Sequence, residues 1–103
     1  MNIRPEIDVD VEALAAFCRR HRVRHLALFG SALRDDFGPQ SDIDLLVEFD
    51  PGATPGLFTI AGMEQELSTL FGGHEIDLRT YHDLSRYFRD EVQATALPLY
   101  AAA

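Results

Sequence analysis

Two neighbouring stretches decide the fold of this chain, LFGSALR at residues 28–34 and SDIDLLV at residues 41–47. The second reads as a β-strand, yet it carries Asp42 and Asp44 on either side of one apolar residue. Side chains alternate between the faces of a strand, so both aspartates point one way, roughly 6.6 Å apart at ~3.3 Å per residue. Carboxylates in an apolar strand are costly unless a cation meets them. The pattern therefore predicts a cation site.

A Gly-Ser turn stands in front of this strand. Gly30 and Ser31 follow a strand expected over residues 23–29, and a short helix is expected to start at Ser31. Glycine lets the backbone approach a phosphate closely, and a helix start offers free N–H groups and here a hydroxyl. Arg34, one turn further, can add a charge-assisted contact. Gly-Ser pairs also mark many ordinary turns, so it is the position before the Asp-x-Asp strand that indicates phosphate binding.

A third aspartate repeats the arrangement, because Asp77 stands between Ile76 and Leu78 in a short apolar segment. If this segment pairs with the Asp-x-Asp strand at a spacing of about 4.8 Å, Asp77 completes a cluster of three carboxylates. Such carboxylates raise one another's pKa unless a cation neutralises them. All-oxygen sites suit Mg²⁺ or Mn²⁺, and two such ions clamp a displacement at phosphorus. The competing interpretation, aspartates that only solvate a sheet edge, conflicts with the low strand propensity of aspartate.

The composition limits the possible classes of protein. A chain of 103 residues that is 47% hydrophobic has room for one core, so residues 1–103 are expected to form a single domain. Its net charge of −8 repels a phosphate backbone and argues against direct nucleic-acid binding. Cys18 is the single cysteine, which excludes a disulfide framework and is typical of a small core residue. No signal-peptide pattern or membrane-length segment occurs, so a soluble, cytoplasmic protein is expected.

Hydrophobic periodicity predicts alternating helices and strands. Apolar residues at helical spacing, which include Val11 and Leu57, predict helices over residues 8–20 and 57–71. A capping box at Thr80–Asp83 predicts the start of a third helix. The expected helices cover residues 8–20, 57–71 and 80 to near Pro98, and the expected strands cover 23–29, 41–49 and 74–79. This order indicates an α/β (α+β) domain with a small mixed sheet of about three strands and helices packed mainly on one face.

A set of spaced residues resembles the nucleotidyltransferase superfamily of DNA polymerase β, and within it the minimal nucleotidyltransferase (MNT) branch of small single domains. These residues are Gly30, Ser31, Arg34, Ser41, Asp42, Asp44 and Asp77. The resemblance implies the nucleotidyltransferase fold. It also implies that Asp42 and Asp44 hold the metal ions of a nucleotide triphosphate. Asp77 would help to bind the second metal ion and would deprotonate the attacking hydroxyl. Gly30 and Ser31 would cradle the phosphates, and Arg34 and Ser41 would complete the nucleotide-binding set.

The resemblance further implies a function. Many MNT proteins are antitoxins encoded with a HEPN-domain toxin, so it implies Mg²⁺-dependent transfer of AMP from ATP to a hydroxyl, a tyrosine, of such a toxin. The two proteins would form a hetero-oligomer without contact to nucleic acid or membrane. Many relatives carry arginine at the position of Ala32 and glycine at that of Asp35, which weakens the expected electrostatics beside the phosphates. Two alternatives stay open: a binding module that neutralises its partner sterically, and a stand-alone nucleotide or metal sensor.

Overall fold

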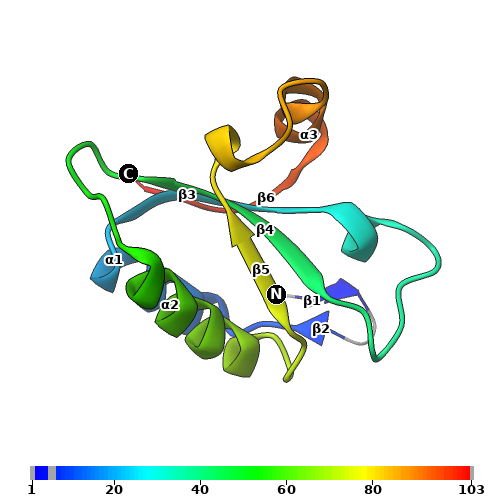
Figure 1. Cartoon of the computed structure of the whole chain (residues 1–103). Coiled ribbons are helices and arrows are strands. Elements are labelled where there is room, and N and C mark those ends of the chain that lie inside the picture. The colour runs from blue at the N-terminus through cyan, green and yellow to red at the C-terminus, as the bar shows by residue number, and fades with distance from the viewer. Residues whose placement is uncertain (1, 5–6, 103) are drawn as a thin grey trace.

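The computed structural model describes residues 2–4 and 7–102, with side chains from residue 7 onward. In chain order the elements are β1 (Asn2–Arg4), β2 (Ile7–Asp8), α1 (Val11–Arg20), β3 (Val23–Phe29), the 3₁₀ turn η1 (Gly30–Leu33), β4 (Ile43–Phe49), α2 (Leu57–Leu70), β5 (Ile76–Arg79), the 3₁₀ turn η2 (Tyr81–Asp83), α3 (Arg89–Thr95) and β6 (Leu97–Ala101). The main sheet has the order β5-β4-β3-β6, in which only the β4–β5 pair is parallel. Helices α1 and α2 cover one face, and α3 lies over the other (Figure 1).

The first predicted elements match the structure, with small shifts at their starts. Strand β3 occupies the expected residues. Helix α1 starts only after Asp10, whose carboxylate accepts hydrogen bonds from the backbone N–H groups of Glu12 and Ala13. Strand β4 starts two residues later than expected. Its predicted first residue, Ser41, forms a turn with Gly38: the Ser41 N–H donates to the Gly38 carbonyl, and the Gly38 N–H donates to the Ser41 hydroxyl, both at 3.0 Å.

The prediction of one long helix from Thr80 to near Pro98 is wrong. The expected capping contact forms, since the Thr80 N–H donates to Asp83 Oδ2 at 3.0 Å, but the turn that it starts is the three-residue η2. Leu84 then adopts an extended conformation and is buried, at 5% exposure. Burying this side chain turns the chain before α3 begins, so tertiary packing overrides the helical periodicity.

The sheet has four strands rather than about three, because the C-terminal segment forms β6. This strand pairs antiparallel to β3 and lies at one edge of the sheet. The sequence pattern predicted Pro98 as a helix stop, but proline also fits an edge strand, where its missing N–H leaves no ladder bond unmade. The N-terminal hairpin, in which β1 pairs antiparallel to β2, was likewise not predicted.

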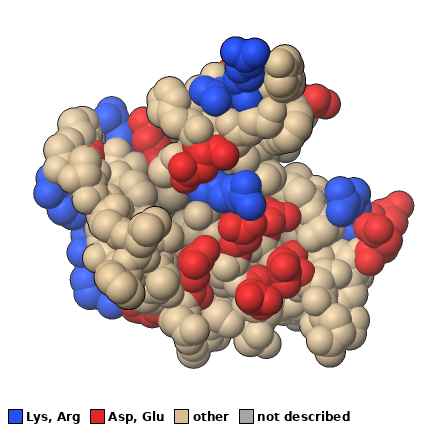
Figure 2. Space-filling model, in the orientation of Figure 1, with Lys and Arg blue, Asp and Glu red and all other residues tan. Residues whose placement is uncertain are grey.

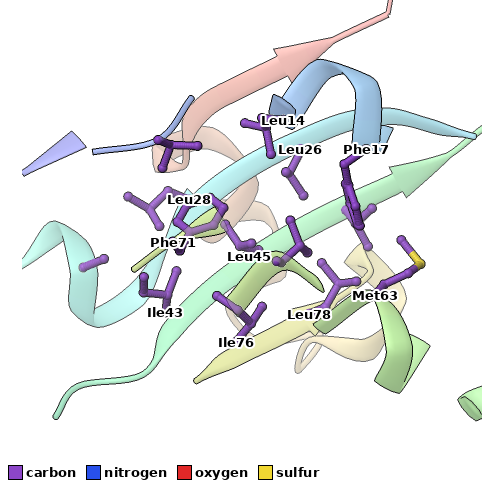
Figure 3. Packing of buried hydrophobic residues seen from close by; sticks show 14 of the residues in the cluster. Leu14, Phe17, Leu26, Leu28, Ile43, Leu45, Met63, Phe71, Ile76 and Leu78 are labelled. Carbon is purple, nitrogen blue, oxygen red and sulfur yellow. The ribbon is translucent and has the colours of Figure 1, made fainter. Parts of the chain in front are cut away.

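One hydrophobic core fills the space between the sheet and helices α1 and α2 (Figure 3). Strands β4 and β5 contribute Ile43, Leu45, Ile76 and Leu78, and the helical side includes Leu14, Phe17, Met63 and Phe71. Cys18 also lies in this core, where burial raises the pKa of its thiol to about 12, in line with a packing role.

Two of the apolar residues at helical spacing are exposed, Val11 at 52% and Leu57 at 88%. Both are the first residue of their helix, and the buried stripes start further along, at Leu14 and Met63. Ile7 and Val9, which lie before α1, fill the core instead.

Within the described ranges, every helix falls short of the length and apolar character that crossing a bilayer requires.

Candidate active site

The parallel pairing of β4 with β5 brings two of the predicted aspartates together. Asp44 pairs with Asp77, and Ile43 with Ile76 one step earlier. The isoleucines are buried at 0% and 5% exposure, so strand alternation turns both carboxylates to the opposite, open face of the sheet. Figure 2 shows acidic side chains gathered around basic ones where β4 and β5 run in Figure 1. Asp42 precedes β4 by one residue and is exposed.

The Gly-Ser turn lies directly against these carboxylates. Gly30 has a positive φ of 74°, and a Cβ atom at this position would lie 2.3 Å from Asp44 Oδ2. Glycine is therefore required for both the backbone conformation and the close approach. The Ser31 hydroxyl donates to the Asp42 carbonyl at 2.9 Å, which ties the turn to the start of β4.

The surroundings of Asp44 disfavour its ionised form. Burial raises the pKa of this carboxyl, and the charges of Asp77 and Asp42 raise the pKa further. The Ser31 backbone N–H and the Arg79 guanidinium oppose this effect. A cation bound here would relieve the repulsion and favour the ionised carboxylate.

Arg79 is a member of the site that the sequence analysis missed. Its Nε donates to Asp77 Oδ2 at 3.1 Å, and both side chains are about half exposed. Arg79 lies two residues after Asp77 and therefore on the same face of β5. The Asp-x-Arg spacing could have revealed this cation, because it repeats the Asp-x-Asp spacing of β4.

Glu64 is a second residue that the sequence analysis missed. Its Oε2 accepts a hydrogen bond of 2.8 Å from the backbone N–H of Leu78. This bond joins α2 to the outer side of β5, an edge strand, and fixes the strand that carries Asp77 and Arg79. In the sequence Glu64 is one of several polar residues on a helix, and nothing distinguishes it.

The remaining predicted residues belong to the loop that joins η1 to β4. Arg34 Nε lies 3.5 Å from Asp36 Oδ1, on largely exposed side chains. The Ser41 hydroxyl takes part in the turn with Gly38, and its carbonyl lies 2.9 Å from the Nδ1 of His74. These contacts of Arg34 and Ser41 hold the loop together and join it to His74, and they do not involve the three aspartates.

The carboxylate oxygens of the three aspartates suit a hard divalent cation, although the described residues do not form a preassembled metal site. Among residues 7–102, no group of three His, Cys, Asp or Glu side chains stands ready to hold a metal ion. Asp77 instead contacts Arg79. The chemistry nevertheless fits, since the three aspartates offer only oxygen ligands, which Mg²⁺ prefers. Burial and, to a smaller extent, the charges of Asp77 and Asp42 raise the pKa of Asp44, so a bound cation would favour its ionised form.

Comparison with known proteins identifies the class. The model of the nucleotidyltransferase domain family matches residues 8–97. The chain therefore belongs to this family and is a nucleotidyltransferase. A protein of Methanocaldococcus jannaschii, provisionally named a protein adenylyltransferase, is 33% identical over 73 residues, which are 71% of this chain and 75% of the relative.

Solved structures narrow the class further. A structure provisionally described as a minimal nucleotidyltransferase matches with a TM-score of 0.68 at 33% identity, over 85% of this chain and 87% of the other. A toxin–antitoxin structure with AMP-PNP matches at 0.70 and 19% identity, over 91% and 75% of the two chains. A complex of the tri-AMPylated Shewanella oneidensis HEPN toxin with its MNT antitoxin matches at 0.62 and 19%, over 89% and 70%. The fold is that of a minimal nucleotidyltransferase, which confirms the resemblance seen in the sequence.

Proposed function

We propose that this protein is a protein adenylyltransferase that transfers AMP from ATP to a hydroxyl, a tyrosine, of a HEPN-type toxin and thereby acts as its antitoxin in the cytoplasm. The observation that carries the proposal is the β4–β5 register, which sets Asp44 beside Asp77 and against the Gly30–Ser31 turn. The relative named as an adenylyltransferase supports the chemistry. The structural neighbours, which are toxin–antitoxin complexes, support the partner.

Each residue of the site would have its own role in the reaction. Asp42 and Asp44 would hold Mg²⁺, with Mn²⁺ as a substitute and Asp77 as a shared ligand. The metal would neutralise charge on the phosphates and on the oxygens that attack and leave. Because Gly30 has no Cβ, the Asp44 carboxylate lies directly against the Gly-Ser turn, and a phosphate held by this turn would be next to the carboxylate. The attacking hydroxyl would give its proton to Asp77 as its oxygen bonds the α-phosphorus and the bond to the β-phosphate breaks, releasing pyrophosphate.

Arg79 supplies a cation where the phosphate side of the site is short of one. Ala32 is buried at 2% exposure, so this position contributes packing rather than charge. The Arg79 guanidinium already contacts Asp77 and influences the pKa of Asp44. When Asp77 turns to the metal and the acceptor, the guanidinium is free to donate hydrogen bonds to the α-phosphate, a contact of the strong, charge-assisted kind.

One observation favours a second function, a binding module that neutralises the toxin sterically. The Arg79 guanidinium forms an ion pair with the Asp77 carboxylate, and such a pair can partly neutralise the carboxylates without a metal. In this case the aspartates would be structural remnants of a catalytic site.

A single comparison separates the two functions. The protein is incubated with Mg²⁺, ATP labelled in its α-phosphate, and a HEPN-domain protein encoded beside it. Transfer of label that is lost in the Asp42→Asn/Asp44→Asn variant is the result expected of an enzyme. Absence of label, together with neutralisation of the toxin by this variant at the wild-type level, would establish the binding module instead. The absence of a HEPN-like neighbouring gene would count against the toxin–antitoxin assignment itself.

A further inference from the structure

The open face of the sheet carries a cavity that the proposed chemistry does not use. Its volume is about 530 Å³. Strands β3 and β4 provide the floor, α3 and η2 lie over it, and β6 closes one side. Pockets of roughly 300–1,000 Å³ with apolar walls and a few polar groups are typical of small-molecule sites. The cavity is thus large enough for a nucleoside.

The cavity begins next to the carboxylates. Leu46 lies on its floor, pairs with Arg79 across the strands and follows Asp44 by two residues on the same face of β4. At ~3.3 Å per residue, Leu46 is about 6.6 Å from Asp44 along the strand. A nucleotide with its α-phosphate at Asp44 and Asp77 therefore has the cavity within reach of its sugar.

The lining favours a neutral, planar group over a phosphate. No lysine or arginine is among the described residues that line the cavity, whereas Glu48 is. The lining also includes His25 and His82, and His25 Nε2 lies 3.8 Å from Glu48 Oε1. Because the lining offers no lysine or arginine to a phosphate, we place the phosphates at the Gly30 end of the site. The floor and walls are largely apolar, with Leu46, Ala96 and Pro98 among them.

Two residues of the lining suit a nucleobase. Gln93 brings a side-chain amide, which can both donate to and accept from the edge of an adenine. Tyr81 brings an aromatic ring, and bases stack on aromatic rings. This ring is held in place, because its hydroxyl donates to Asp90 and the Arg89 guanidinium lies 5.2 Å from its centroid.

We propose that this cavity is the nucleoside subsite, with the base edge at Gln93 and the base plane against Tyr81. The inference rests on the proposed nucleotidyl transfer, and it names the part of the chain that selects the nucleotide. It assigns base recognition to η2 and α3, for which the sequence pattern predicts one helix and no functional role.

The test fills the cavity at the C-terminal end of α3. Ala96, the extended residue that follows the helix, lines the cavity, whereas Ala94 in the last turn of α3 is exposed and does not line it, so Ala96→Phe is compared with Ala94→Phe as its neighbouring control. Binding of ATP with Mg²⁺, of adenosine and of inorganic tripolyphosphate is measured by calorimetry for both variants and the wild type. Ala96→Phe is expected to weaken ATP and adenosine binding about tenfold or more and to leave tripolyphosphate unchanged, while Ala94→Phe changes none of them.

The other outcomes are equally decisive. Wild-type affinity for ATP in Ala96→Phe overturns the inference, and loss of AMP transfer with intact ATP binding assigns the cavity to the acceptor instead. A wild-type protein that binds tripolyphosphate with Mg²⁺ but not adenosine also overturns it. A wild-type protein that binds no nucleotide at all refutes the proposed function itself. Should Ala96→Phe fail to fold, Gln93→Leu is expected to reduce the preference for ATP over GTP several-fold, and an unchanged preference counts against Gln93 as the base reader.

Discussion

Replacing Gly30 by alanine tests the geometry of the site most directly. The substitution adds one Cβ atom, 2.3 Å from Asp44 Oδ2, at a residue whose φ is 74°. Two separate costs follow. A residue with a side chain is disfavoured in this left-handed conformation, and the Asp44 carboxylate must move away from its hydrogen bond with the Ser31 N–H.

The two costs can be estimated separately. The left-handed backbone costs roughly 1–2 kcal/mol for a residue other than glycine. Forcing the Asp44 side chain away from its preferred rotamer adds about 0.5–1.5 kcal/mol. The total is about 1.5–3.5 kcal/mol. For a domain of this size, 2 kcal/mol corresponds to a fall of roughly 8–16 °C in Tm.

Thermal and urea denaturation of a double-mutant cycle separate the two costs. Asp44→Ala removes the carboxylate, so in that background Gly30→Ala is expected to cost only the backbone part. Gly72→Ala is the matched control, because Gly72 has a φ of 77° and a Cβ there would meet nothing within 4 Å. Coupling between positions 30 and 44 of about 1 kcal/mol is expected, above the roughly 0.3–0.5 kcal/mol within which independent sites add. A coupling of zero, with equal costs at Gly30 and Gly72, would refute the contact.

Three further predictions concern charge and packing. Asp44→Asn should raise Tm near neutral pH, because the pKa of Asp44 is raised in the folded state and its ionised form therefore destabilises the fold. The gain in Tm should vanish in thermal melts as the pH falls below the unfolded-state pKa of about 3.9, where Asp44 is protonated in both states. Arg79→Gln should reduce AMP transfer to a partner while unfolding shifts by less than about 1 kcal/mol, because its pair with Asp77 is half exposed; a large stability loss with normal transfer would make Arg79 structural. Leu67→Ala, at a residue with 0% exposure, should cost about 2–5 kcal/mol in urea unfolding, against little for the neighbouring Ser68→Ala.

The parts of the fold that were predictable are those whose signal is local. Strand β3 lies between the turn at His21 and the Gly-Ser turn, and its apolar pattern locates it to the residue. The pairing of Asp44 with Asp77 was predictable for a related reason: each of the two lies between apolar neighbours that must be buried. Conversely, Pro98 has the same local meaning at the end of a helix and in an edge strand. Only the pairing of β6 with β3, some 70 residues earlier in the chain, decides between them.

The parts of the site that were missed depend on long-range contacts. Glu64 matters because α2 packs against the edge of β5, which brings its carboxylate to the Leu78 N–H. The cavity exists because Leu84 is buried and separates η2 from α3, so that Gln93 comes to lie over β4. The helical periodicity of residues 84–96 contains no trace of that break. Motif spacing could therefore predict that Asp44 and Asp77 come together, but not the cavity that we assign to the nucleoside.

The hydrophobic core is what places the carboxylates on one surface. Ile43 and Leu45 on β4, and Ile76 on β5, are each at most 5% exposed, so the parallel register of these strands is fixed by their burial. A slip of one residue would turn Asp77 into the core and Ile76 to solvent, which would bury a carboxylate and expose an apolar side chain. The pKa of Asp44, which burial and the neighbouring charges of Asp77 and Asp42 raise, thus depends on apolar packing on the other face of the same strands. The packing of the opposite face therefore holds the backbone positions of Asp44 and Asp77 side by side without any bound cation.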